Sequence, residues 1–206
     1  NNVSGGGLTV DSSNQNAATA TISGNTVTVT PKTITAPTTV NITVTRAATQ
    51  NYKAATAVHT AKILGTIQYS ASKYEGTYDG SAHGINVSTT TSGATITYST
   101  DGTSYSSTKP TYTNVGEYTT HYKITATDYK TVSGTLTVKI TQANGSLTLD
   151  PTSKTYSASG TFTVKNNVSG GALSVSSSNQ NAATATVSGS TVTVTPKTIT
   201  APTTVD

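Results

Sequence analysis

The chain contains a long internal repeat. Residues 1–40 align without gaps on residues 166–205, and only a handful of positions differ. The differences are mild: Gly7 against Ala172, Thr9 against Ser174, Asp11 against Ser176, Ile22 against Val187 and Asn25 against Ser190. Self-similarity at a fixed spacing is the signature of a repeat architecture, in which one structural module is copied along the chain. Because the sequence opens and closes inside the repeated block, we expect it to be an excerpt from a longer array.

The repeated block has the pattern of β-strands joined by turns. Apolar residues alternate with threonine in Ala18–Ile22 and Thr26–Thr30, and Ser23-Gly24-Asn25 predicts a tight hairpin between them. Later in the chain, Thr100-Asp101-Gly102-Thr103 is a second hairpin signal. Only 33% of the residues are hydrophobic, but threonine and tyrosine replace the missing apolar residues and suit a half-buried pleated surface. The sequence therefore predicts an all-β fold with thin cores.

We divide the chain into three modules, at 1–65, 66–143 and 144–206. The first is the back part of a sandwich, the last is the front part of another sandwich of the same type, and the middle one is a complete sandwich of a second type. We expect Leu64-Gly65-Thr66 to be a linker. The expected strands are Leu8–Val10, Ala18–Ile22, Thr26–Thr30, Val40–Val44, Ala55–Ile63, Gln68–Ala71, Gly84–Val87, Ala94–Ser99, Tyr118–Ala126, Thr135–Thr141, Ser146–Leu149 and Thr161–Val164.

Four tyrosines are candidate structural residues. Tyr98 and Tyr118 fall on the positions of their alternating strands that we expect to face a core. The segment from Tyr52 to Ile63 aligns without a gap on the segment from Tyr129 to Ile140. We therefore expect both module types to close with a Tyr-Lys corner followed by one long strand.

The repeated block is similar to a known type of domain. Ser12 to Gly24, followed by Thr26–Val29 and Thr39–Val44, resembles the group 2 bacterial immunoglobulin-like domains. In that family a polar Ser-Ser corner precedes an Ala-Thr hairpin and a closing strand of alternating threonines. The resemblance implies an immunoglobulin-like (Ig-like) β-sandwich.

The middle module resembles a second Ig-like repeat, the Tyr-Asp-Gly type of long bacterial surface proteins. The matching residues are Tyr78–His83, Ala94–Gly102, Pro110–Tyr118 and Tyr129-Lys130. Asn114, Gly116 and Tyr118 have the spacing of a tyrosine corner, in which the ring enters the sandwich and its hydroxyl bonds a nearby backbone group. Together the two resemblances imply tandem Ig-like sandwiches arranged end to end.

Composition and charge argue against several partners. The net charge of +4 comes from twelve basic and eight acidic residues that are spread singly, so we expect no nucleic-acid surface. No apolar run approaches the roughly 18 residues of a membrane span, and we expect no membrane contact by this segment. The absence of cysteine excludes disulfides, zinc-thiolate sites and thiol catalysis within this sequence.

The chain offers no converging catalytic or metal-binding pattern. His59 aligns with Leu136 in the closing strand, so we expect it to face a partly apolar interior, while His121 points outward and His83 lies in a loop. A zinc site needs three or four such side chains together. No nucleophile-elbow pattern accompanies the many hydroxyl residues. We therefore expect no metal, no cofactor and no enzyme activity.

These observations lead to one main hypothesis and two alternatives. The main hypothesis is a structural stalk or fibre segment of a bacterial cell-surface protein, outside the cell, whose partners are the neighbouring repeats of the same chain. The first alternative is an adhesin module that binds a glycan or a host protein through exposed loops at Tyr74–His83 or Tyr105–Tyr112. The second is self-assembly into filaments, in which open module edges are completed by strands of another chain.

Overall fold

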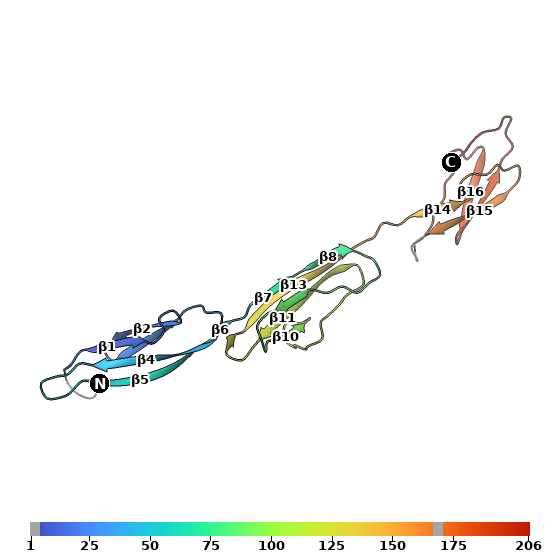
Figure 1. Ribbon diagram of the computed structural model, residues 1–206. Helices are drawn as coiled ribbons and strands as arrows, with labels where there is room; N and C mark the ends of the chain where they lie inside the picture. Colours follow the sequence, from blue (N-terminus) through green and yellow to red (C-terminus); the bar gives the residue numbers. More distant parts are fainter. Residues whose placement is uncertain (1–4, 167–170) are drawn as a thin grey trace. The chain divides into compact units, whose positions relative to one another are not determined.

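The computed structural model describes residues 5–166 and 171–206. Every regular element in these ranges is a β-strand, and none of them is a helix that could cross a membrane (Figure 1). The chain divides into two compact units, unit 1 (Asn1–Gln142) and unit 2 (Ala143–Asp206). The predicted all-β fold is confirmed.

The first sandwich of unit 1 comprises residues 8–63. One sheet has the order β1-β4-β5, and β2 and β3 form a second sheet, all antiparallel. The strands are β1 (Leu8–Ser12), β2 (Ala18–Ser23), β3 (Thr26–Pro31), β4 (Thr38–Arg46) and β5 (Ala55–Ile63). Gly24 has a φ of 58°, the positive value that the two-residue hairpin between β2 and β3 requires. The buried core consists of small and aliphatic side chains, namely Ala17, Ala18, Val40, Ile42 and Ile63.

The second sandwich of unit 1 comprises residues 67–141 and has a larger core. Its sheets have the orders β10-β11-β13-β8 and β7-β9. The strands are β7 (Tyr69–Ser72), β8 (Tyr74–Thr77), β9 (Asn86–Thr89), β10 (Thr95–Ser99), β11 (Gly116–Thr125) and β13 (Val132–Thr141). Residues of both sheets, together with Ile67 and Ile85 just outside the strands, form the buried core, which consists of Ile67, Ile85, Val87, Tyr98, Tyr122, Ile124, Val138 and Ile140.

Two segments predicted as loop or linker are strands. The exposed loop predicted at Tyr74–His83 is wrong for its first four residues, which form β8 and pair in parallel with Val138–Thr141 of β13. The linker predicted at Leu64-Gly65-Thr66 is also wrong. Gly65–Thr66 forms β6, which pairs in parallel with β12 (Tyr129–Lys130), and Gly65 is buried. Both strands form because a partner distant in sequence offers backbone hydrogen bonds to a short polar segment.

His59 lies on the predicted face of its strand but is exposed. It is opposite Ile42 of β4 and, with Ile42 and valines of β3 and β4, lines an apolar groove. All the residues from Ala55 to Thr60 are nevertheless exposed. β5 is the outer strand of its sheet and, within the described residues, pairs with β4 alone.

The described strands of unit 2 form one antiparallel sheet of the order β14-β15-β17-β16. The strands are β14 (Leu147–Asp150), β15 (Gly160–Asn166), β16 (Ala183–Ser188) and β17 (Thr191–Pro196). β16 and β17 repeat β2 and β3 of unit 1. Residues 173–177 repeat β1 but form no strand. In unit 1 the partner of β1 is β4, and residues 203–206, which correspond to the first four residues of β4, also form no strand.

Candidate functional site

The junction between the two sandwiches of unit 1 is a built contact surface. Gly65 donates its backbone N–H to the Asp128 carbonyl at 3.0 Å, and Thr66 donates to the Ile34 carbonyl at 2.8 Å. The Lys62 ammonium lies 2.6 Å from the Asp128 carboxylate. Gly65 of the linking strand and Lys62 of β5 thus both contact Asp128 in the second sandwich, whereas Thr66 bonds back to the first sandwich.

Gly65 allows the close approach that this junction requires. A Cβ atom at Gly65 would lie 2.7 Å from Cε1 of Tyr129 and 2.8 Å from the backbone nitrogen of Pro37. The ring of Tyr129 from the second sandwich and the backbone of Pro37 from the first therefore approach Gly65 together. No side chain larger than hydrogen fits between them without a shift. Tyr129, predicted as a structural residue, lies at this junction.

Tyr118 has the geometry of a tyrosine corner. Its hydroxyl donates to the Asn114 carbonyl at 3.2 Å, and its ring stacks on Tyr112 with centroids 4.1 Å apart and planes 7° from parallel. Thr120, two residues further along the same face of β11, is fully buried, and its hydroxyl lies 3.3 Å from the hydroxyl of Tyr112. These side chains tie the loop before β11 to the core.

The other two predicted tyrosines occupy contrasting environments. Tyr98 is 9% exposed in the core of the second sandwich, and burial raises the pKa of its hydroxyl. Tyr52 is 55% exposed and does not pack as Tyr129 does. Its backbone N–H donates to the hydroxyl of Thr49 at 3.2 Å, so the corner at Tyr52 is a local turn. The aligned sequences of the two closing segments thus form different corners.

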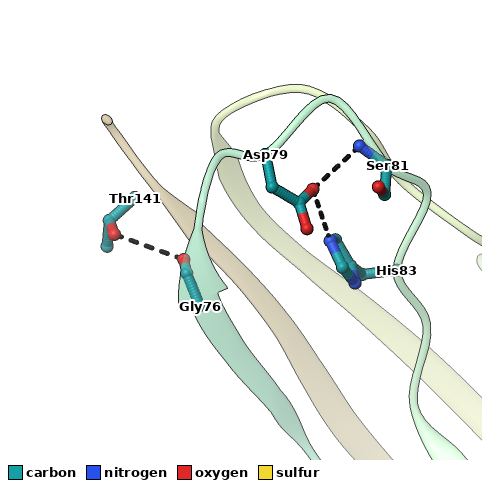
Figure 2. Close-up of polar contacts among 5 residues, drawn as sticks. All are labelled: Gly76, Asp79, Ser81, His83 and Thr141. Atoms are coloured by element: carbon teal, nitrogen blue, oxygen red, sulfur yellow. Dashed lines mark hydrogen bonds and ion pairs between the residues drawn. The ribbon is translucent and has the colours of Figure 1, made fainter. Parts of the chain in front are cut away.

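The Tyr-Asp-Gly segment forms a closed hydrogen-bonded loop, shown in Figure 2. One carboxylate oxygen of Asp79 accepts the backbone N–H of Ser81 at 2.8 Å and lies 2.9 Å from Nε2 of His83. The hydrogen bond from His83, followed by that from Ser81, lowers the pKa of Asp79. Next to this loop, the hydroxyl of Thr141 donates to the Gly76 carbonyl at 3.2 Å and ties β8 to β13.

His83 has a structural environment on its other side as well. Its ring stacks on Tyr74 with centroids 4.1 Å apart and planes 11° from parallel. Its backbone exchanges two hydrogen bonds with Tyr112, at 2.9 and 2.8 Å. Within the described residues, no group of three or more His, Cys, Asp or Glu side chains lies close enough to hold a metal ion. The contacts around His83 fasten a loop, and only Asp79 among the acids of the described chain bonds to it.

The hairpin signal at Thr100–Thr103 corresponds to a wider reversal held by Asp101. The two chain segments pair at Tyr98 and Ser106, with backbone hydrogen bonds of 2.7 and 2.9 Å. One oxygen of the Asp101 carboxylate accepts the Ser99 hydroxyl at 2.7 Å and the N–H groups of Thr103 and Ser104 at 2.8 Å each. These bonds, the first of them the largest cause, hold the pKa of Asp101 far below its ordinary value of 3.8.

Comparisons with known proteins give no family assignment. No family model matches the chain, and no curated protein matches it. Among solved structures, the extracellular cadherin domains 1–4 of protocadherin gamma B7 align with 96% of this chain and 64% of their own, at 12% identity and a TM-score of 0.29. Domains 1–5 of protocadherin gamma B2 align with 93% of this chain and 46% of their own, at 11% identity and a TM-score of 0.29.

A third comparison is of the same kind. Domains 3–6 of protocadherin gamma B2 align with 92% of this chain and 60% of their own, at 9% identity and a TM-score of 0.28. This chain therefore spans less than two thirds of each of these structures. At such scores the likeness adds nothing to the fold assignment, which rests on the strand pairing described above.

Proposed function

We propose that this chain is a spacer segment of a bacterial cell-surface protein, located outside the cell and built from tandem Ig-like sandwiches. The observation that carries the proposal is the junction at Gly65. A linker between independent domains is solvent-exposed and makes few contacts. Here the connection is itself a strand, with backbone hydrogen bonds to Asp128 on one side and Ile34 on the other.

Such a junction suits a part whose task is to hold a distance. Backbone hydrogen bonds and a buried glycine restrict the hinge motion that a flexible linker permits. The resemblance of the sequence to bacterial Ig-like repeats supports an extracellular location and a bacterial source. The near identity of residues 1–40 and 166–205 also supports the proposal, because a spacer gains length by copying a module.

The spacer function predicts a narrow distance distribution across the junction. The chain has no cysteine, so Ser23→Cys and Thr108→Cys place one spin label in each sandwich of unit 1 at exposed positions. We expect pulsed electron paramagnetic resonance to give one narrow peak for the distance between the two spin labels. Replacing Gly65 and Thr66 by a six-residue Gly-Ser linker is expected to broaden it. A native distribution as broad as that of the Gly-Ser variant would refute the proposal.

The adhesin alternative gains no support from its candidate rings. Tyr74 is stacked on His83 and Tyr112 on Tyr118, each at 4.1 Å. Tyr105 lies beneath the ammonium of Lys123, which is 4.2 Å from the ring centroid. Tyr74 and Tyr112 also pack against the hydrophobic core of the second sandwich, so these two rings have a structural role. Loss of glycan-array binding on Tyr105→Ala, with wild-type binding present, would nevertheless favour this alternative over the spacer.

A further inference from the structure

The segment that enters the second sandwich runs alongside the segment that leaves it. β6 pairs in parallel with β12, and β8 pairs in parallel with the C-terminal end of β13. In both places the partner residue lies 64 positions further along the chain. Between these two contacts β7 belongs to the other sheet, where it pairs with β9. The chain continues on both sides of this sandwich, with β5 before it and β14 after it, so tension along the chain passes through it.

The parallel pairing decides how such tension acts on the sandwich. A force that extends the chain pulls β8 toward its N-terminal end and β13 toward its C-terminal end. In a parallel pair these two ends lie at opposite ends of the pair, so the strands are pulled past each other and all the hydrogen bonds between them are loaded at once. In an antiparallel pair the same two ends lie side by side, and the bonds open one after another.

Several contacts hold β8 against β13 in addition to their four residue pairs. The backbone N–H of Tyr78 donates to the Thr141 carbonyl at 2.8 Å. The Thr141 hydroxyl donates to the Gly76 carbonyl at 3.2 Å, as Figure 2 shows. The carboxylate of Glu75 lies 3.8 Å from the ammonium of Lys139. Backbone and side chains of both strands therefore resist sliding.

Both strands are also fastened to the rest of the sandwich. β13 pairs with β11 on its other edge over nine residue pairs, and its residues Val138 and Ile140 are buried in the core. The loop after β8 is closed by Asp79, which accepts the N–H of Ser81 and contacts the ring of His83 (Figure 2). Sliding β8 toward its N-terminal end pulls on this loop as well.

The ring of Tyr74 covers the β8 backbone. A Cβ atom at Gly76 would lie 2.8 Å from Cζ of Tyr74, so the ring lies directly over this glycine. The same ring stacks on His83 at 4.1 Å and packs against the hydrophobic core. Hydrogen bonds that are shielded from water are stronger than exposed ones. The cover of Tyr74 therefore strengthens the contact of β8 with β13.

We propose that the second sandwich bears tension along the chain, and that the parallel contact of β8 with β13 is the clamp that resists its extension. The bonds of this clamp share the load, so they break together and not in sequence. The function goes beyond that of the spacer, which concerns bending at the junction, whereas the clamp lies inside the second sandwich. A flexible junction would refute the spacer and leave the clamp intact.

Pulling the sandwich from two directions tests the clamp. The chain has no cysteine, so full-length double variants accept DNA handles for optical tweezers at chosen exposed positions. Leu64→Cys with Gln142→Cys applies force to opposite ends of the β8–β13 pair, and Ser81→Cys with Gln142→Cys applies it to one end. We expect a several-fold higher unfolding force for the first pair of handles, in chains of equal urea midpoint. Equal unfolding forces for both pairs would overturn the proposal.

A matched pair of proline variants gives a second measurement. Tyr78→Pro removes the N–H that donates to Thr141 in the clamp. Ser106→Pro removes an N–H that donates to the Tyr98 carbonyl at 2.9 Å, in the same sandwich but outside the clamp. Forced unfolding depends on the unfolding rate and not on the equilibrium stability. With the first pair of handles, we expect Tyr78→Pro to lower the unfolding force and Ser106→Pro to leave it unchanged. Equal losses in the two folded variants would overturn the proposal.

Discussion

The Lys62 ammonium lies 2.6 Å from the Asp128 carboxylate and links β5 of the first sandwich to the turn before β12 of the second. Asp128 has a φ of 67°, and its carbonyl accepts the N–H of Gly65. The side chains of Lys62 and Asp128 are 59% and 34% exposed, so water screens their attraction. The junction therefore depends more on its backbone contacts and on the fit around Gly65 than on this ion pair.

Lys62→Ala is expected to have a small effect on stability. An exposed ion pair contributes about 0.2–1 kcal/mol, and screening by salt lowers this further. We expect the free energy of unfolding of unit 1 to fall by that amount at low salt and by less in 1 M salt, measured by urea titration of the full chain. Lys73→Ala is the control, because it removes an exposed ion pair, with Glu75 at 3.1 Å, that lies within the second sandwich and does not cross the junction. A loss above about 2 kcal/mol would show that the charge pair dominates the junction.

Gly65→Ala is expected to cost more than the loss of the ion pair. The new methyl group would meet the Tyr129 ring and the Pro37 nitrogen at 2.7 and 2.8 Å. Forcing such a contact typically costs about 1–3 kcal/mol. Gly7→Ala is the control: no heavy atom lies within 4 Å of a Cβ there, and the repeat already has Ala172 at this position. Similar unfolding free energies for the two variants would contradict the packed junction.

A double variant separates the two contacts at Gly65. Adding Tyr129→Ala to Gly65→Ala removes the ring but leaves the backbone of Pro37 in place. We expect the two substitutions together to cost less than the sum of their separate effects, with a coupling of about 0.5–3 kcal/mol. Additive effects would mean that the Tyr129 ring does not approach Gly65.

Strands with a local pattern could be predicted from the sequence. β5 has the predicted bounds Ala55–Ile63, and β2 and β3 differ from prediction by one residue each. Alternation over several residues and a glycine in the turn are local signals, and they decide these strands. The bond from Tyr118 to Asn114 is also local, since the two residues are only four positions apart, and the spacing indicated it.

Features that depend on distant partners could not be predicted in this way. β8 is Tyr-Glu-Gly-Thr, with no apolar alternation, and it is a strand because β13 offers an edge. The contact of Lys62 with Asp128 forms only when segments far apart along the chain fold together. The stack of Tyr74 on His83 likewise requires the two sides of a turn to fold together. The exposure of His59 has the same origin, because it depends on the position of β5 as the outer strand of its sheet.

Acid is expected to destabilise the turn at Asp101. The hydrogen bond from Ser99 and those from Ser104 and Thr103 lower the pKa of Asp101 below 3.8 in the folded chain. A depressed folded pKa means that the carboxylate stabilises the fold above pH 3.8 and that this contribution is lost as the pH falls below it. Asp101→Asn should therefore lower the urea midpoint at pH 7, and its difference from wild type should shrink at about pH 2.5.

The control for this experiment is Asp11→Asn. Asp11 is an exposed acid whose carboxylate accepts a side-chain hydrogen bond from Gln15 at 3.2 Å, in place of the two backbone N–H groups that bind Asp101. We expect its urea midpoint to stay close to that of wild type at both pH values. A difference between Asp101→Asn and wild type that stays constant between pH 7 and about 2.5 would show that the charge of Asp101 does not stabilise the turn.

Tyr118 allows the hydroxyl and the ring of a tyrosine corner to be tested separately. Tyr118→Phe removes the 3.2 Å bond to Asn114 but keeps the stack on Tyr112, so we expect a loss of about 0.5–1.5 kcal/mol in unfolding free energy. Tyr118→Ala also removes the ring and should cost roughly 3–5 kcal/mol if the ring contributes as a core aromatic does. Tyr52→Phe is the control, because Tyr52 is largely exposed, and should change stability by less than about 0.5 kcal/mol. If Tyr118→Phe were as harmless as Tyr52→Phe in urea titrations of the full chain, the hydroxyl would contribute nothing and only the stacked ring would hold the loop before β11.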